Sequence, residues 1–478
     1  MLLACGAAAA ALVLPDGRLR TAALTVALVA APVLVLGDVW NEPRIVDFRH
    51  SAAQVGAGLA IVVLGLAALV AAFRRYRQAF AIAAVAVLPM RVPVEIGGET
   101  ANLLIPLYLV IAAGVLTNAF WPTREAGPAE PVAASARWLR RLLAATLVLY
   151  AIQASYSEDV PNAIENTGFF LVPFAVLFVM LAQIRWTRAL LRRALIAITA
   201  VAAACAAVGI YQYFARDLFF NPELFDSNEL HVYFRVNSIF FDPNIFARYL
   251  ALAMTALGVC VAWGGSRRDL AAAAGVFAVG LVALAFSYSI TGFAALLAGL
   301  ATAAVMRWRW RGVAGVAALG LAGLVTLALA GGTPTSDVED YRSIDSGHAD
   351  LIEGGIDLAQ DRPLAGWGSG AFGRAFYERI EPARTTVSHS EPITVAAEQG
   401  AIGLAVYVAV LGAALATLFG GAVWTSLARS AVAACFVAMV VSSFGYTGFT
   451  TDPATWALLA LGLALRRDPP EPSATIPT

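Results

Sequence analysis

The residues of this sequence that could do chemistry gather at 388–404, where a polar stretch ends and an apolar one begins. His389 opens the segment, and Glu391 and Glu398 follow at short spacing. An imidazole titrates near neutral pH, so a histidine beside carboxylates could take a proton from a substrate hydroxyl. The alternative is a capping or surface histidine, and the convergence of several polar residues favours function.

A second group of polar residues begins at Arg235 and runs into another apolar stretch. Asn244 stands at the start of that stretch, a common place for a helix N-cap. Arg248 lies further in, where an unpaired charge is costly inside a membrane, so it should face other protein groups or reach back to the surface. The sequence is compatible both with ligand binding by Arg248 and with a side chain that reaches back to the membrane surface. Guanidinium groups bind diphosphates through charge-assisted hydrogen bonds.

The composition of the whole chain is that of a membrane protein. Of its 478 residues 60% are hydrophobic and 13% charged, and the mean hydropathy is +0.75. This balance excludes a water-soluble globular protein. Recurrent apolar stretches without strand-like alternation predict an all-α polytopic bundle of roughly 12–15 spans. The stretches 2–14, 79–92 and 452–466 are short, so some of them should be half-helices or interfacial.

Arginine is the strongly basic residue of this chain, which contains no lysine. Arginine-rich connections alternate along the sequence with acidic ones. The arginine-rich connections are 74–77, 124–141, 185–193, 267–268, 307–311 and 466–467. Positive connections stay in the cytoplasm. We therefore expect a multi-pass protein of the cytoplasmic (inner) membrane whose chemistry, including all four histidines, faces outward.

Two of the outward connections are long, and their aromatic and apolar residues predict folded caps. Within the second, the apolar spacing predicts a helix at 348–361 that stops before Pro363. The expected parts are an N-terminal transmembrane bundle at 1–331 that includes the outside loop 216–243, a large extracytoplasmic loop at 332–392, transmembrane helices at 393–467 and a cytoplasmic tail at 468–478.

Three segments of the sequence are similar to motifs of the bacterial O-antigen ligase and O-antigen polymerase family. In the first, the residues in register are His389, Glu398, Gly400, Gly403 and Leu404, with Ser390 and Pro392 at positions where the family has asparagine and an aromatic residue. The second is 235–247, with Ser238 in place of glycine, and the third is 361–372. Three motifs in this order, over roughly residues 200–445, make a fairly specific signal.

The resemblance implies a GT-C-type membrane glycosyltransferase that acts on a polyprenyl (undecaprenyl) diphosphate-linked glycan. It would transfer that glycan to a glycan or lipid-glycan acceptor, or lengthen it, during assembly of cell-surface polysaccharide. The implied catalytic residues are His389 and Glu398, the implied contacts of the donor diphosphate are Arg235, Arg248, Arg342 and Arg362, and the implied supporting residues are Asn244, His348 and Glu391. We expect neither a metal nor another cofactor, and no nucleic acid partner.

The sequence departs from the family at two positions that usually hold arginine, which here are His348 and Thr291. The family arginines are thought to hold the donor diphosphate, so the departures imply that this task shifts to the arginines named above.

The alternative function is a transporter or flippase of a lipid-linked glycan. That function predicts charged residues at mid-span and broken helices in paired halves. This sequence instead concentrates its polar residues at one face. A membrane scaffold without activity is a third possibility.

Overall fold

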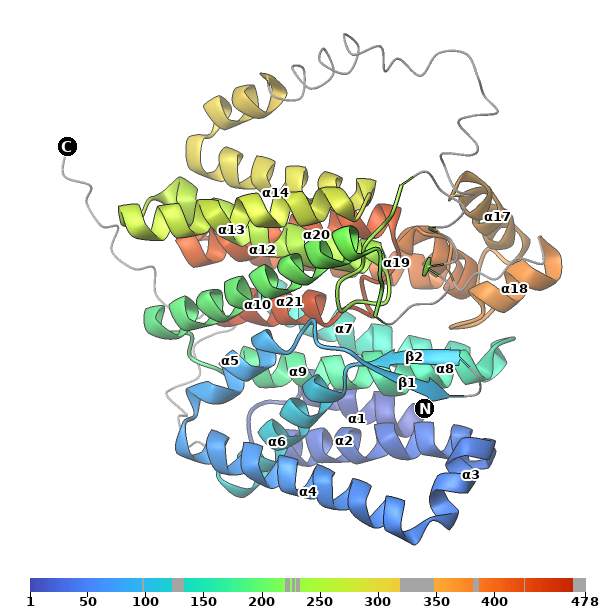
Figure 1. Ribbon diagram of the computed structural model, residues 1–478. Helices are drawn as coiled ribbons and strands as arrows, with labels where there is room; N and C mark the ends of the chain where they lie inside the picture. The colour runs from blue at the N-terminus through green and yellow to red at the C-terminus, as the bar shows by residue number, and fades with distance from the viewer. Residues whose placement is uncertain are drawn as a thin grey trace.

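The computed structural model describes residues 1–96, 99–122, 133–219, 224–225, 228, 233–318, 348–380, 387–424 and 426–466. These residues are mostly helical, and the helices form a single bundle (Figure 1). Within the described ranges, nine helical segments are long and apolar enough to cross a membrane, and three shorter apolar helices accompany them. The prediction of an all-α, polytopic membrane protein is therefore confirmed.

The first half of the chain forms one side of the bundle. Its helices are α1 (Leu2–Val13), α2 (Arg18–Asp38), α3 (Pro43–His50), α4 (Ala52–Arg75), α5 (Gln78–Ala86), α6 (Ile105–Phe120), α7 (Ala134–Gln153), α8 (Val160–Glu165) and α9 (Val172–Ala182). Between α5 and α6 the chain forms an antiparallel hairpin of β1 (Val92–Ile96) and β2 (Glu99–Leu103), with Val94 opposite Ala101. The sequence pattern did not predict this hairpin.

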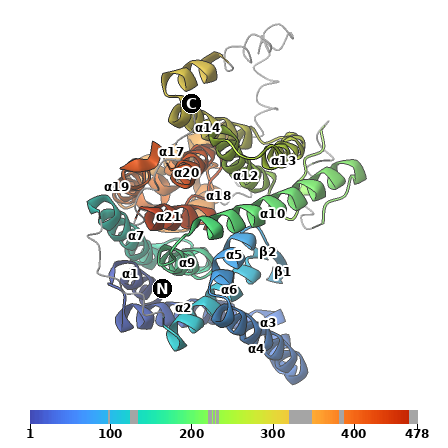
Figure 2. The same cartoon turned by 90° about the vertical axis from the view of Figure 1, so that its left-hand side faces the viewer.

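The second half supplies the other side and the centre. Its helices are α10 (Arg188–Ala215), α12 (Pro243–Trp263), α13 (Arg267–Phe286), α14 (Ile290–Trp308), α17 (His348–Asp361), α18 (Phe372–Arg379), α19 (Glu391–Phe419), α20 (Leu427–Gly445) and α21 (Pro453–Leu465). The predicted helix at 348–361 is α17. Helices α10, α12, α13 and α14 lie on one side, α1, α2 and α4 on the other, and α19, α20 and α21 between them (Figure 2).

The two ends of the bundle differ. Helices α17 and α18 lie at one end, at the right of Figure 1. The arginines that end α4 and the arginines that begin α10 and α13 lie at the opposite end. The acidic and polar connections therefore gather away from the arginine-rich ones.

Helix α19 is broken at Gly400, whose φ of 64° and ψ of −164° are not helical. The break leaves backbone groups of the helix without their usual partners, and the segment 363–368 takes them up. Trp367 N donates to Ala397 O at 3.0 Å, Gly368 N donates to Glu398 O at 2.8 Å, and Ala401 N donates to Pro363 O at 2.7 Å. The glycine-rich segment before α18 is thus fixed directly to a transmembrane helix.

Replacing Gly400 with Ala should destabilise the fold. The new Cβ would lie 2.3 Å from the carbonyl oxygen of Leu364, and the left-handed φ is unfavourable for alanine. We expect a loss of roughly 1–3 kcal/mol, seen as a lower thermal midpoint of the purified protein in detergent. Gly412→Ala is the matched control, because it lies in the same helix with open space around its Cβ. Equal midpoints for the two variants would contradict this account of the break.

Candidate active site

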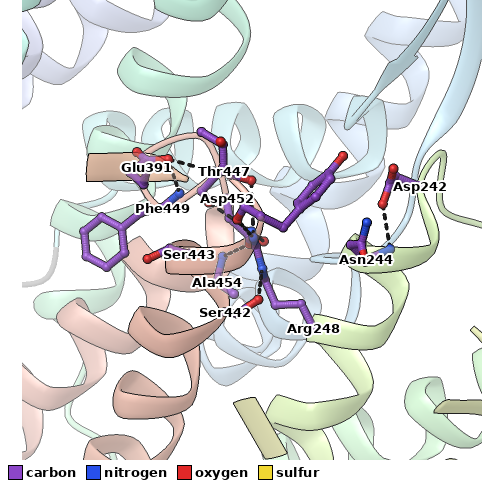
Figure 3. Close-up of polar contacts among 12 residues, drawn as sticks. Asp242, Asn244, Arg248, Glu391, Ser442, Ser443, Thr447, Phe449, Asp452 and Ala454 are labelled. Carbon is purple, nitrogen blue, oxygen red and sulfur yellow. Dashed lines mark hydrogen bonds and ion pairs between the residues drawn. The ribbon is translucent and has the colours of Figure 1, made fainter. Parts of the chain in front are cut away.

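The connection between α20 and α21, residues 446–452, is held from one side by Arg248 of α12 (Figure 3). Arg248 is only 2% exposed. Its hydrogen-bond acceptors are Ser442 Oγ at 2.9 Å, Gly448 O at 3.1 Å, Asp452 Oδ2 at 3.4 Å, Thr447 O at 3.2 Å and the carbonyl oxygen of Tyr446. A guanidinium has five N–H groups, and these five acceptors match them. Arg248 therefore faces the bundle interior and does not snorkel.

Glu391, the first residue of α19, holds the same connection from the other side. Its Oε2 accepts hydrogen bonds from the amides of Gly448 at 2.8 Å and Phe449 at 3.1 Å. Its Oε1 accepts from the amide of Thr450 at 3.3 Å and from the Thr450 hydroxyl at 3.2 Å. The guanidinium of Arg248 thus binds the carbonyls of 446–448, and the carboxylate of Glu391 binds the amides of 448–450. Both side chains are buried.

His389 lies against this connection. Its ring centroid is 5.5 Å from that of Tyr446. The backbone of His389 has a φ of 59°, a left-handed conformation that needs support in a residue with a side chain. The support comes from the buried hydroxyl of Ser388, which donates to Ser390 O at 2.8 Å and accepts from Ser390 N at 3.2 Å. His389 is half-buried, and its backbone is held in one conformation.

Tyr446 links His389 to the second polar group. Asp242 is an electrostatic neighbour of its phenol, and the guanidinium of Arg248 lies 5.7 Å from its ring centroid. Burial, followed by the charge of Asp242, raises the pKa of the Tyr446 phenol. The phenol therefore stays protonated at neutral pH and keeps its donor.

Arg235 lies at the same end, on the connection that precedes α12. Its backbone N–H donates to Asn228 Oδ1 at 2.9 Å, and its Nε donates to Ser287 O at 3.1 Å. One Nη is 3.5 Å from Asn244 Oδ1. Within the described ranges no carboxylate forms an ion pair with Arg235. The guanidinium thus keeps capacity for an anionic ligand.

Asn244 is not the N-cap that the sequence suggested. Asp242 caps α12, with Asn244 N donating to Asp242 Oδ1 at 2.6 Å. The Asn244 side chain instead accepts from Ser289 Oγ at 2.7 Å. Ser289 also caps α14 by accepting from Gly292 N at 3.1 Å. Asn244 therefore joins the start of α12 to the start of α14, beside Arg235.

Glu398 has a different environment from the one expected. Its two carboxylate oxygens accept from Gly370 N at 2.9 Å and from Phe372 N at 3.3 Å, and the residue is 8% exposed. These bonds fix the turn that leads into α18. The geometry therefore favours a positioning role for Glu398 at this turn, whereas the resemblance implied a catalytic one.

Arg362 lies with the turn that Glu398 holds. Its guanidinium is 3.8 Å from the ring centroid of Trp367 and 3.5 Å from Glu158 Oε1, and its side chain is 45% exposed. It lines an open cleft of about 420 Å³ together with Tyr156 and residues 363–366. Arg362 can therefore meet a ligand from this cleft.

Two predicted residues cannot be placed. Arg342 lies outside the described residues. His348 begins α17, but its side chain also lies outside the described part. Their roles stay predictions.

Sequence reasoning missed Tyr446, Asp452 and Arg91. The signal for the first two was a polar run, 446–452, between two apolar stretches on the outward side. Arg91 precedes β1, and its electrostatic neighbours include Asp452, Tyr446 and Arg248. Nothing in the sequence near Arg91 connects it with residues so far along the chain.

Residues 275–408 match a family model described as O-antigen ligase. This match supports membership of the O-antigen ligase and polymerase family. The matched segment contains α17, α18, His389 and the break at Gly400. It indicates a multi-pass, ligase-type membrane enzyme of surface polysaccharide assembly, a family that acts on lipid-linked glycans and glycan acceptors. No curated protein matches the chain.

Replacing Arg248 with Met should destabilise this O-antigen ligase-like protein, because the carbonyls of 446–448 and the carboxylate of Asp452 would lose a buried cation. Removing one partner of a buried pair costs about 3–5 kcal/mol. The thermal midpoint in detergent should fall clearly.

The control for this experiment is Arg374→Met. Arg374 pairs with Glu378 on the surface of α18 and is 56% exposed, so its loss should change the midpoint far less. Similar midpoints for the two variants would show that Arg248 does not hold the connection.

Proposed function

We propose that this protein transfers a glycan from a polyprenyl diphosphate to an acceptor hydroxyl, either as a ligase or as a polymerase. The observation that carries the proposal is the gathering of His389, Tyr446 and Arg235 at one end of the bundle, in a chain whose 275–408 segment matches O-antigen ligase. The site has a titratable base, a phenol donor and a cation, which suit transfer from a diphosphate.

The arrangement of charge supports an extracytoplasmic site in the cytoplasmic membrane. The arginines at the end of α4 and at the start of α13 lie at the end of the bundle opposite α17 and α18 (Figure 1). Arginine-rich connections are retained in the cytoplasm. The end that carries His389 then faces outward, where a lipid-linked glycan and its acceptor meet.

In the proposed reaction, His389 accepts the proton of the acceptor hydroxyl. The hydroxyl oxygen forms a bond to the anomeric carbon of the donor glycan while the bond from that carbon to the diphosphate oxygen breaks. Polyprenyl diphosphate leaves with the electron pair, and a guanidinium beside it stabilises the negative charge. The protonated imidazole returns its proton to solvent before the next cycle.

Of the other predicted residues, some contact the substrates directly in this proposal and others act by holding the connection 446–452. Arg235 contacts the diphosphate directly, and Arg362 meets the donor or acceptor from the cleft beside Trp367. Arg248 and Glu391 act through the connection 446–452 that they hold. Arg342 and His348 stay candidates for further donor contacts.

His389→Ala should lower product formation by at least about a hundredfold, the lower limit for loss of a general base. The assay reconstitutes the protein in liposomes with a labelled polyprenyl-diphosphate-linked oligosaccharide and an acceptor glycan, and it measures new glycosidic product and released polyprenyl diphosphate. His50→Ala, an exposed histidine of α3, is the control and should keep full activity.

Full activity of a correctly inserted His389→Ala variant would contradict the role of the imidazole. Movement of the labelled glycan across the bilayer without any new glycosidic bond would contradict the enzyme proposal itself and would favour the transporter or flippase.

A further inference from the structure

Arg91 is a half-buried cation at the edge of the candidate site. Its buried Nε has no hydrogen-bond partner in the described part of the chain. Its guanidinium lies 5.7 Å from the ring centroid of Phe240, which belongs to the same motif as Arg235. A ring face attracts a cation but does not satisfy its N–H groups. Within the described residues, Arg91 therefore holds a buried donor, its Nε, that no acceptor satisfies.

The carboxylate of Asp452 does not meet this need. Asp452 is the first of the neighbouring charges that favour the charged form of Arg91. Asp452 is, however, engaged elsewhere: its Oδ1 accepts from Ala454 N at 2.9 Å and caps α21, and its Oδ2 is 3.4 Å from Arg248. Burial lowers the pKa of Arg91, so the surroundings disfavour its charge. A bound anion would offset this cost of burial by stabilising the charged guanidinium.

Arg91 and Arg235 both lie within electrostatic reach of the Tyr446 phenol. Tyr446 is an electrostatic neighbour of Arg91, and Arg235 and Arg248 are electrostatic neighbours of Tyr446. Arg248 uses its donors on the connection 446–452, as described above. Arg91 and Arg235 thus differ from Arg248 in having donors available beside the ring that contacts His389.

We propose that Arg91 is a second anion contact that binds the diphosphate of the lipid-linked donor jointly with Arg235. The inference rests on the proposed function and deepens it. It assigns a ligand-binding residue to the connection between α5 and β1, outside the 275–408 segment that matches O-antigen ligase. Two guanidiniums can hold the two phosphates separately, each through paired N–H groups.

Direct binding of farnesyl diphosphate, a short isoprenyl diphosphate without glycan, tests the assignment. The protein is placed in nanodiscs of neutral phosphatidylcholine, and the Kd is measured for wild type, Arg91→Gln, Arg91→Lys and Arg49→Gln. Arg49 is a matched control because it also lies over an aromatic ring, that of Trp40 at 4.0 Å, and also has a buried Nε without a partner. Arg49 belongs to α3, which lies on the side of the bundle formed by α2 and α4.

We expect Arg91→Gln to weaken farnesyl diphosphate binding at least tenfold, Arg91→Lys to recover part of the loss and Arg49→Gln to bind as wild type does. In the transfer assay, Arg91→Gln should raise the KM for the donor more than it lowers kcat. The thermal midpoint of each variant is measured in parallel, and Arg91→Lys, which keeps the charge, separates loss of binding from loss of folding.

Three results would overturn the assignment: wild-type protein that does not bind farnesyl diphosphate, Arg91→Gln that binds it as tightly as wild type does, and an Arg91 effect confined to nanodiscs containing phosphatidylglycerol. The last result would make the ligand a phospholipid headgroup. Arg91-dependent diphosphate binding by a protein that forms no glycosidic product would support the assignment while refuting the proposed transfer, so the two failures are distinguishable.

Discussion

The candidate site depends on one short connection that is bound by opposite charges on its two sides. Arg248 donates hydrogen bonds to the carbonyls of 446–448, and Glu391 accepts hydrogen bonds from the amides of 448–450. Both side chains are buried, so their hydrogen bonds are formed where water competes little. A connection between two helices would otherwise have many conformations. Here its backbone polar groups are satisfied in one conformation, and that conformation places the Tyr446 ring against His389. The charges thus contribute specificity as well as stability.

The same principle operates at the turn before α18. Helix α19 is broken at Gly400, and the segment 363–368 hydrogen-bonds to the backbone groups beside the break. Glu398 accepts hydrogen bonds from the amides of Gly370 and Phe372. In both places a carboxylate near the start of α19 receives the amides of a connection from elsewhere in the chain. Helix α19 therefore organises the α18 side and the Tyr446 side of the site together. A change at its outward end should affect both.

Much of this arrangement could be predicted from the sequence because it is encoded locally. Hydropathy predicted the helical membrane fold, and the apolar spacing predicted α17 with its observed bounds. The spacing from His389 to Leu404 indicated the resemblance to O-antigen ligases, which the match over 275–408 supports. The connections could not be predicted because they are long-range. The acceptors of Arg248 lie about two hundred residues away along the chain. Arg91 becomes an electrostatic neighbour of Tyr446 only when the two halves of the bundle pack. Asn244 was mistaken for a cap because Asp242, two residues before it, fits that position as well. The roles expected for Arg342 and His348 depend on side chains beyond the described residues.

The central claim is that the polar end of the bundle, beside the fixed connection 446–452, binds the diphosphate of a lipid-linked glycan. The most direct measurement is an electron cryomicroscopy map of the protein in nanodiscs with its polyprenyl-diphosphate-linked donor bound. The account predicts diphosphate density between Arg91 and Arg235, the first sugar next to His389 and an unchanged connection 446–452. Diphosphate density at the arginine-rich end of the bundle, or in the cleft beside Arg362 with the Tyr446 region empty, would contradict it.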